Sequence, residues 1–288
     1  MKKIVRKVVL SFFKKNKDIY LVDPHRDEDF LIESLSKEHL LGIDTEFDWR
    51  NTYFPKLSLL QIATESKIYL IDCLKVKNIN FLRNLLESKN KLIVFHSSRS
   101  DTTVLFTNLN ISIQNVFDIQ IAEKNISKGE IENYASLVNK YFHINLKKTE
   151  TNSNWLRRPF SEEQLSYAAN DVNFLIEIYK LQLKILKKKN LLVKTLEDSK
   201  REANLGNQDL SISRVKKLNK ASKIEKSIFL WRENYAKDLN IPSSHIFNNK
   251  NLKKLAFLSQ NNKIEKKEIH SYFKKSLYVK DFIEFLKN

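Results

Sequence analysis

The chain has 288 residues, of which 42% are hydrophobic and 11% aromatic, so it can form one large domain or two smaller ones. Its single cysteine, Cys73, excludes an internal disulfide and a cysteine-based zinc site. The formal charge of +17 favours a polyanionic partner, nucleic acid above all. No apolar run approaches the ~18–20 residues that span a membrane, so we expect a cytoplasmic protein without a membrane partner.

The first part of the chain predicts a short meander of strands. Residues 1–18 are basic and are expected to form a helical or frayed extension. A strand at 19–22 and a helix at 27–37 precede a strand at 40–46. Branched residues at 57–64 and 67–71, joined by the polar pair Glu65-Ser66, are typical of a hairpin.

Strands and helices then alternate. Helices are predicted at 81–88, 101–109, 119–125 and 131–141, and strands at 91–95 and 115–117. After a polar segment at 145–160, a capping box begins a helix at Ser161. This helix is expected to continue past Asp171 as far as Ile178, with one face formed by residues spaced four, three and four apart. The pattern predicts an α/β fold with a mixed sheet flanked by helices.

The C-terminal part lacks strand patterns and is rich in lysine. Residues 205–288 hold 18 Lys and Arg against 8 Asp and Glu. Helical stripes at 224–237, 250–259, 264–274 and 277–287 predict a small helical bundle. We therefore divide the chain into an extension at 1–18, an α/β domain at 19–204, a linker at 205–223 and a helical domain at 224–288.

Asp44 and Glu46 are the first candidate site residues. They lie two residues apart at the carboxyl end of a predicted strand, so their side chains share one face. Clustered carboxylates repel one another, and a divalent cation between them removes that cost. An exposed strand face with two acids is the alternative interpretation.

Three later residues complete the set of candidates. Asp101 opens a helix directly after the strand at 91–95, although an acid in a first helical turn is also favoured by the helix dipole. Asp171 lies one turn after Tyr167, on a helix face that continues with apolar residues. A carboxylate on a buried face needs a partner. Simple solvation of Asp171 and core packing of Tyr167 are the alternatives.

The order of these motifs is specific. Asp-Thr-Glu-Phe at 44–47, His-Ser-Ser-Arg-Ser-Asp at 96–101 and Tyr-x-x-x-Asp at 167–171 resemble the three exonuclease motifs of the tyrosine-bearing (DEDDy) branch of the DEDD superfamily. Segments at 52–57, 118–120 and 148–160 are similar to those of ribonuclease D. Residues 230–242 resemble the start of an HRDC domain. The chain departs from the family at Ser97, Ser98 and Asn154, and has room for one HRDC copy.

The resemblance implies a ribonuclease-H-like fold and a 3'-5' exoribonuclease that trims single-stranded RNA, with precursors of transfer RNA as one class of substrate. Two Mg²⁺ or Mn²⁺ ions would be held by Asp44, Glu46, Asp101 and Asp171, and Tyr167 would orient the attacking water. Products would be nucleoside 5'-monophosphates. It also implies substrate contacts by five further residues: Thr45, Phe47, His96, Trp155 and Arg158.

Several alternatives stay open at this point. His96 could instead have a structural role, and Trp155 could belong to the core. DNA is a second possible substrate, because the active-site motifs of RNA and DNA 3'-5' exonucleases barely differ. A nucleic-acid-binding protein with a decayed nuclease site is a third interpretation. The loss of one acid or of Tyr167 would be typical of such a protein, and all five residues are present.

Overall fold

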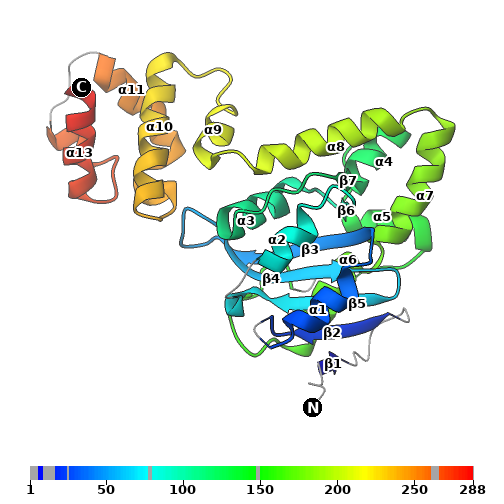
Figure 1. The fold of residues 1–288 in the computed structure, drawn as a ribbon. Helices are drawn as coiled ribbons and strands as arrows, with labels where there is room; N and C mark the ends of the chain where they lie inside the picture. Colours follow the sequence, from blue (N-terminus) through cyan, green and yellow to red (C-terminus); the bar gives the residue numbers. More distant parts are fainter. Residues whose placement is uncertain are drawn as a thin grey trace. The chain divides into compact units, whose positions relative to one another are not determined.

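The chain forms a mixed sheet flanked by helices and a separate helical unit (Figure 1). The computed structural model describes residues 6–8, 17–24, 26–76, 80–146, 150–260 and 266–287. By its contacts the chain divides into two compact units. The first unit comprises Met1–Asp48 and Lys56–Asn207, and the second comprises Trp49–Pro55 and Gln208–Asn288.

The sheet of the first unit has seven strands among the described residues, in the order β1-β2-β5-β4-β3-β6-β7. The strands are β1 (Arg6–Val8), β2 (Asp18–Val22), β3 (Leu40–Asp48), β4 (Lys56–Ala63), β5 (Lys67–Asp72), β6 (Leu92–Phe95) and β7 (Val116–Asp118). β4 is antiparallel to β3 and β5, which confirms the predicted hairpin. Because β3, β6 and β7 run parallel, their carboxyl ends meet at one edge of the sheet.

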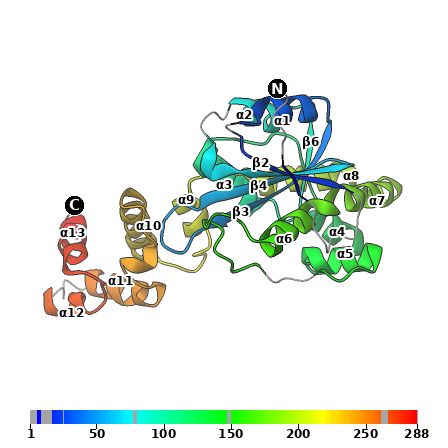
Figure 2. The same cartoon turned by 90° about the horizontal axis from the view of Figure 1, so that it is seen from below.

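Helices cover both faces of this sheet (Figure 2). One face packs against α1 (Glu28–Leu35), α2 (Asn80–Leu86), α3 (Arg99–Leu109) and Ala203 of α8 (Leu192–Gly206). The other packs against α4 (Ile119–Ser127), α5 (Tyr134–Phe142), α6 (Glu162–Asn173) and α7 (Leu175–Lys188). Alternate residues of β5 enter the two cores, as strand geometry requires: Tyr69 and Ile71 face one, Ile68 and Leu70 the other. The predicted mixed α/β architecture is confirmed.

The N-terminal segment differs from the expected helix or frayed extension. Arg6–Val8 is a strand that pairs antiparallel with β2. This pairing satisfies backbone groups that β2 would otherwise expose at the sheet edge. The rest of the expected extension lies mostly outside the described residues; within it, Lys17 and Asp18 are described, and Asp18 already belongs to β2.

The predicted continuous helix from Ser161 to Ile178 is wrong. α6 starts with the expected capping box but ends at Asn173, and α7 begins at Leu175. Phe174 lies between them with φ −108° and ψ 0°. The apolar spacing is maintained across the break, so sequence periodicity could not reveal it.

The second unit is helical and contains the four predicted helices. They are α10 (Lys223–Asp238), α11 (Leu252–Gln260), α12 (Lys266–His270) and α13 (Ser276–Lys287), with α9 (Leu210–Val215) inside the expected linker. Short 3-10 turns occupy Ser243–His245 and Asn249–Asn251, and a further one, Cys73–Lys75, follows β5 in the first unit. None of the helices in the described part of the chain is long and apolar enough to cross a membrane.

Residues Trp49–Pro55 belong to the second unit although they directly follow β3. Tyr53 is 1% exposed in the core of this unit, and its amide donates to Asn240 Oδ1 at 3.1 Å. The Arg214 guanidinium lies 4.7 Å from the centre of the Tyr53 ring and pairs with Glu233 at 2.7 Å. The sequence-based division missed this contribution, because the segment is irregular and far from residue 208 in the chain.

Candidate active site

Three predicted carboxylates from distant segments meet beside the sheet. Asp44 and Glu46 lie on β3 and Asp171 on α6, and one oxygen of each lies within 4.8 Å of the others. All three residues are half-buried. The strand places Asp44 and Glu46 on one face, as their spacing predicted.

Asp101 adjoins this cluster from the first turn of α3. It is 4% exposed, and its Oδ1 accepts from the Thr45 amide at 3.0 Å and from the Thr45 hydroxyl at 2.6 Å. Burial raises the pKa of Asp101 well above its usual range, and the charge of Asp44 raises it further. The structure therefore brings all four predicted acids into one electrostatic neighbourhood.

The pKa values of Asp44 and Glu46 are shifted in the same direction. Burial raises the pKa of Asp44, and the nearby Asp171 adds to this effect. Burial also raises the pKa of Glu46, followed by the charges of Asp44, Asp171 and Asp101. Such a set of oxygen ligands suits a hard divalent cation, whose charge would offset their mutual repulsion.

Gly42 explains how α6 approaches β3 closely enough for this meeting. A Cβ atom on Gly42 would lie 3.0 Å from Leu175 Cβ and 3.6 Å from the Val172 carbonyl oxygen. The missing side chain lets the junction of α6 and α7 pack on the strand two residues before Asp44. Asp171 is thereby carried to the same face of β3 as the first acid pair.

The connection from β6 to α3 is held by Asp118. Its carboxylate accepts from the Ser97 amide at 3.0 Å and the Ser98 amide at 2.8 Å, and it also caps α4 through the Gln120 amide. Ser97 has a φ of 65°, in the left-handed region, so these bonds stabilise an uncommon backbone conformation. They fix the start of the helix that carries Asp101.

A pocket of about 260 Å³ opens beside the acids. Asp44 and Asp171 line it together with Tyr167, His96 and Tyr134. The Tyr167 hydroxyl lies 3.4 Å from Thr151 Oγ1, and burial, aided by the charge of Asp171, raises the pKa of this phenol.

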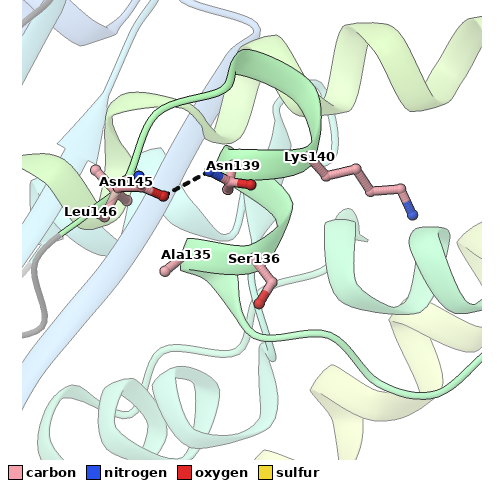
Figure 3. Close-up of a pocket in the computed structure, with 6 residues that line it drawn as sticks. All are labelled: Ala135, Ser136, Asn139, Lys140, Asn145 and Leu146. Carbon is pink, nitrogen blue, oxygen red and sulfur yellow. Dashed lines mark hydrogen bonds between the residues drawn. The ribbon is translucent and has the colours of Figure 1, made fainter.

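Other pocket residues escaped sequence reasoning, among them Tyr134, Thr151 and Asn170. An aromatic residue at the start of a helix is indistinguishable from ordinary core, so Tyr134 carried no sequence signature. A second hollow, of about 360 Å³, lies along α5 and shares the lining residues Ala135 and Leu146 with this pocket. There the side chains of Asn139 and Asn145 point toward one another across a 2.7 Å hydrogen bond (Figure 3).

The expected substrate contacts have different outcomes. His96 lines the pocket, and its Nε2 lies 3.0 Å from the Glu132 carbonyl oxygen. Thr45 is only 5% exposed and commits its hydroxyl to Asp101. Trp155 is 2% exposed and packs 6.0 Å from the Tyr167 ring, so its faces are not open for stacking. Burial favours the core alternative for Trp155, and the two bonds to Asp101 give Thr45 a role within the acid cluster; substrate contact by either residue stays a prediction.

Arg158 and Phe47 also have contacts within the fold. The Arg158 guanidinium forms two hydrogen bonds with Asp72, at 2.9 Å and 2.7 Å, and others with Ser58 and the Trp155 carbonyl. Phe47 is half-buried and packs against the core under α1 and α2. Arg158 therefore ties the polar segment before α6 to β4 and β5, a structural role that its charge did not indicate.

Comparison with known proteins decides the family. The sequence of residues 20–187 matches the family described as 3'-5' exonuclease. The chain belongs to this family. The resemblance to ribonuclease D is confirmed as well. The chain is 32% identical over 230 residues to Ribonuclease D of Desulfotalea psychrophila, and the matched residues cover 75% of this chain and 60% of that protein. The chain thus spans about three fifths of the length of the curated relatives it matches.

Solved structures support the fold. The Escherichia coli RNase D structure, described as an exoribonuclease involved in structured RNA processing, matches with a TM-score of 0.74 at 21% identity, covering 83% of this chain and 66% of that one. Brucella melitensis NrnC with bound Mg²⁺ matches with a TM-score of 0.53 at 21% identity, covering 61% and 91%. The expected ribonuclease-H-like exonuclease fold is confirmed.

Proposed function

We propose that this exonuclease removes nucleotides from the 3' end of single-stranded RNA by metal-assisted phosphodiester hydrolysis, releasing nucleoside 5'-monophosphates. The observation that carries the proposal is the meeting of Asp44, Glu46 and Asp171 beside a pocket that Tyr167 also lines. The similarity to curated ribonuclease D proteins supports RNA as the substrate, with 3'-extended precursors of transfer RNA as one class.

The four acids would hold two Mg²⁺ or Mn²⁺ ions. The donor set fits these cations, because it offers only carboxylate oxygens and carries an unrelieved mutual repulsion. The Mg²⁺-bound NrnC structure shows that a protein with this fold can hold such an ion. When bound, the ions would supply an activated water and stabilise charge on the leaving oxygen.

The chain's own residues would do the rest. Thr45 holds Asp101 in place through two hydrogen bonds to one oxygen. The Tyr167 phenol is protonated at neutral pH, and its raised pKa favours that form further, so it can donate a hydrogen bond and orient the attacking water. The second unit, which we assign to the HRDC type, would contact RNA phosphates through its lysines.

An exonuclease assay tests the proposal directly. A 5'-labelled RNA with a free 3' end should be shortened stepwise in Mg²⁺ or Mn²⁺ and remain intact in EDTA. Asp44→Ala and Asp171→Ala should abolish trimming, whereas Glu130→Ala, at an exposed loop position, should trim like the unchanged protein. Trimming by either aspartate variant would refute the site. A DNA oligonucleotide of the same sequence, degraded faster than RNA, would refute the choice of substrate.

The role of Tyr167 needs a separate measurement. Tyr167→Phe keeps the ring next to Trp155 but removes the hydroxyl, so we expect turnover to fall ~10²–10⁴-fold, as for loss of a positioned proton donor. The Mn²⁺ concentration required for half-maximal activity should change little. If Tyr167→Phe instead needs a higher Mn²⁺ concentration for half-maximal activity and has normal turnover at saturating Mn²⁺, Tyr167 belongs to the metal-binding residues.

A further inference from the structure

A side chain from another helix is bonded to the backbone at the break between α6 and α7. In a continuous helix the Phe174 amide would donate to the Asn170 carbonyl, four residues earlier. Instead, the hydroxyl of Tyr134 on α5 stands between them: it accepts from the Phe174 amide at 3.1 Å and donates to the Asn170 carbonyl at 3.2 Å. Insertion of a polar group into this ladder is a recognised cause of helix kinks.

A second backbone group at the break is also paired. The Asn173 carbonyl accepts from Lys17 Nζ at 3.0 Å, and the same ammonium reaches the Thr64 carbonyl at 2.9 Å and the Glu177 carboxylate at 3.4 Å. Tyr134 and Lys17 are 9% and 7% exposed, so both bond sets are shielded from water. A kink with its polar groups paired in this way is a built feature of the fold.

Asp171 lies in the turn that Tyr134 opens, between Asn170 and Phe174. The conformation of that turn sets the direction of the Asp171 backbone. It therefore also sets whether the Asp171 carboxylate points toward Asp44 and Glu46. The Tyr134 ring also lines the pocket beside these acids. The contact between α5 and α6 is therefore in a position to control the geometry of the acid cluster.

We propose that Tyr134 is a positioning residue for the divalent-cation site and acts through Asp171. Without its hydroxyl, the Phe174 amide can close onto the Asn170 carbonyl, α6 runs on into α7, and Asp171 turns away from Asp44 and Glu46. This inference rests on the proposed function, because it presupposes that the acids bind a cation. Ordinary core packing by the ring would not require the hydroxyl.

The test compares two tyrosines on the same helix. Tyr134→Phe removes the inserted hydroxyl, whereas Tyr141→Phe removes a hydroxyl that donates to Glu123 at 2.6 Å on α4. Each variant loses a hydroxyl and keeps its ring. The readout is the melting temperature as a function of Mn²⁺ concentration in the absence of RNA, which reports metal binding without activity.

We expect Tyr134→Phe to raise the Mn²⁺ dissociation constant about 10–100-fold, the range typical of groups that orient metal ligands. Tyr141→Phe should retain the Mn²⁺ affinity of the unchanged protein even if it melts earlier. Equal Mn²⁺ affinity in all three proteins would overturn the proposal for Tyr134 while leaving the metal site intact. If the unchanged protein shows no response to Mn²⁺, the metal site itself is wrong, and this inference with it.

Amide hydrogen exchange in the unchanged protein covers the case in which Tyr134→Phe does not fold. Coupling between the cation site and the inserted hydroxyl predicts that Mn²⁺ slows exchange of the Phe174 amide, which donates to the Tyr134 hydroxyl and also to the Val172 carbonyl. The Ser136 amide, bonded to its own N-cap Asn133, is the internal reference and should be unaffected. An unchanged rate at Phe174 would overturn the proposal.

Discussion

The hydroxyl of Thr45 donates to Oδ1 of Asp101 at 2.6 Å, and the Thr45 amide donates to the same oxygen at 3.0 Å. Thr45 stands between Asp44 and Glu46 in the sequence. One strand end thus supplies two carboxylates and also the clamp that holds a third, which comes from α3. The residue between the acids serves the site through Asp101, although sequence reasoning had assigned it to the substrate.

Thr45→Val tests this clamp. Valine keeps the shape and β-branching but removes the hydroxyl, so Asp101 loses one of its two bonds from Thr45, and we expect metal affinity to fall about 10-fold. Thr45→Ser is the matched control, because it keeps the donor and should bind metal nearly as the unchanged protein does. Calorimetric titration with Mn²⁺ measures both. Equal affinities for the Val and Ser variants would show that the hydroxyl has no such role.

The pKa shifts of the acid cluster predict how stability depends on pH without metal. Burial and the like charge of Asp171 hold the pKa of Asp44 in the folded protein above its unfolded value of ~3.9. Ionised Asp44 therefore lowers the free energy of unfolding at high pH. This destabilisation disappears as the pH falls from the folded pKa toward ~3.9. Asp44→Asn removes the charge. In EDTA it should therefore melt above the unchanged protein at pH 8, with the difference shrinking as the pH falls.

Glu123 supplies a control, because its pKa is shifted in the opposite direction to that of Asp44. Burial opposes its ionisation, but hydrogen bonds from Lys140, Tyr141 and Gln182 outweigh burial and lower its pKa. That stabilisation is present above the unfolded pKa and is lost as pH falls through the folded pKa. Glu123→Gln should melt below the unchanged protein at pH 8. If Asp44→Asn behaves like Glu123→Gln, the acid cluster is not strained by repulsion.

The meeting of Asp44, Glu46 and Asp171 could be predicted from the sequence, because the position of each has a local cause. Alternation along β3 places Asp44 and Glu46 together, and the capping box at Ser161 sets the phase of the helix that carries Asp171. The kink at Phe174 could not be predicted, because its cause is a hydroxyl about 40 residues away on α5. The buried position of Trp155 and the half-buried, ion-paired position of Arg158 could not be predicted either, since aromatic and guanidinium groups suit both stacking with bases and packing inside a fold.

Gly206, which has no side chain, allows α8 to pack closely against α3. A Cβ atom there would lie 2.0 Å from Thr102 Oγ1 and 2.7 Å from the Arg99 carbonyl oxygen, so the two helices would have to separate. We expect Gly206→Ala to destabilise the protein by about 1–3 kcal/mol, in the range of overpacked cores. Denaturant unfolding measures the change. Gly129→Ala is the control, because its added Cβ would meet mainly the flexible Ser127 side chain; similar losses for both variants would argue against a specific clash.

Deleting the second unit would be a poor test of its role in binding RNA. Deletion of residues 208–288 would remove the residues that pack against Trp49–Pro55, whose Tyr53 is buried within that unit. This segment directly follows the strand that carries Asp44 and Glu46. A loss of activity could then come from a disturbed β3. Substitutions of exposed lysines avoid this ambiguity, because they leave the core of the unit unchanged.

Lys253 and Lys254 are exposed on α11 and suit this purpose. If they pair with RNA phosphates, the Lys253→Gln, Lys254→Gln double variant should bind RNA more weakly at low salt, and the slope of log affinity against log salt should fall by about one for each phosphate that is no longer neutralised. Lys187→Gln with Lys188→Gln on α7 removes the same charge from exposed positions of the first unit. Fluorescence anisotropy across a salt series, on protein with Asp44→Asn to prevent trimming, separates the two pairs. Equal reductions in affinity would indicate that net charge alone sets the affinity, whereas a reduction confined to Lys253 and Lys254 would assign the phosphate contacts to the second unit.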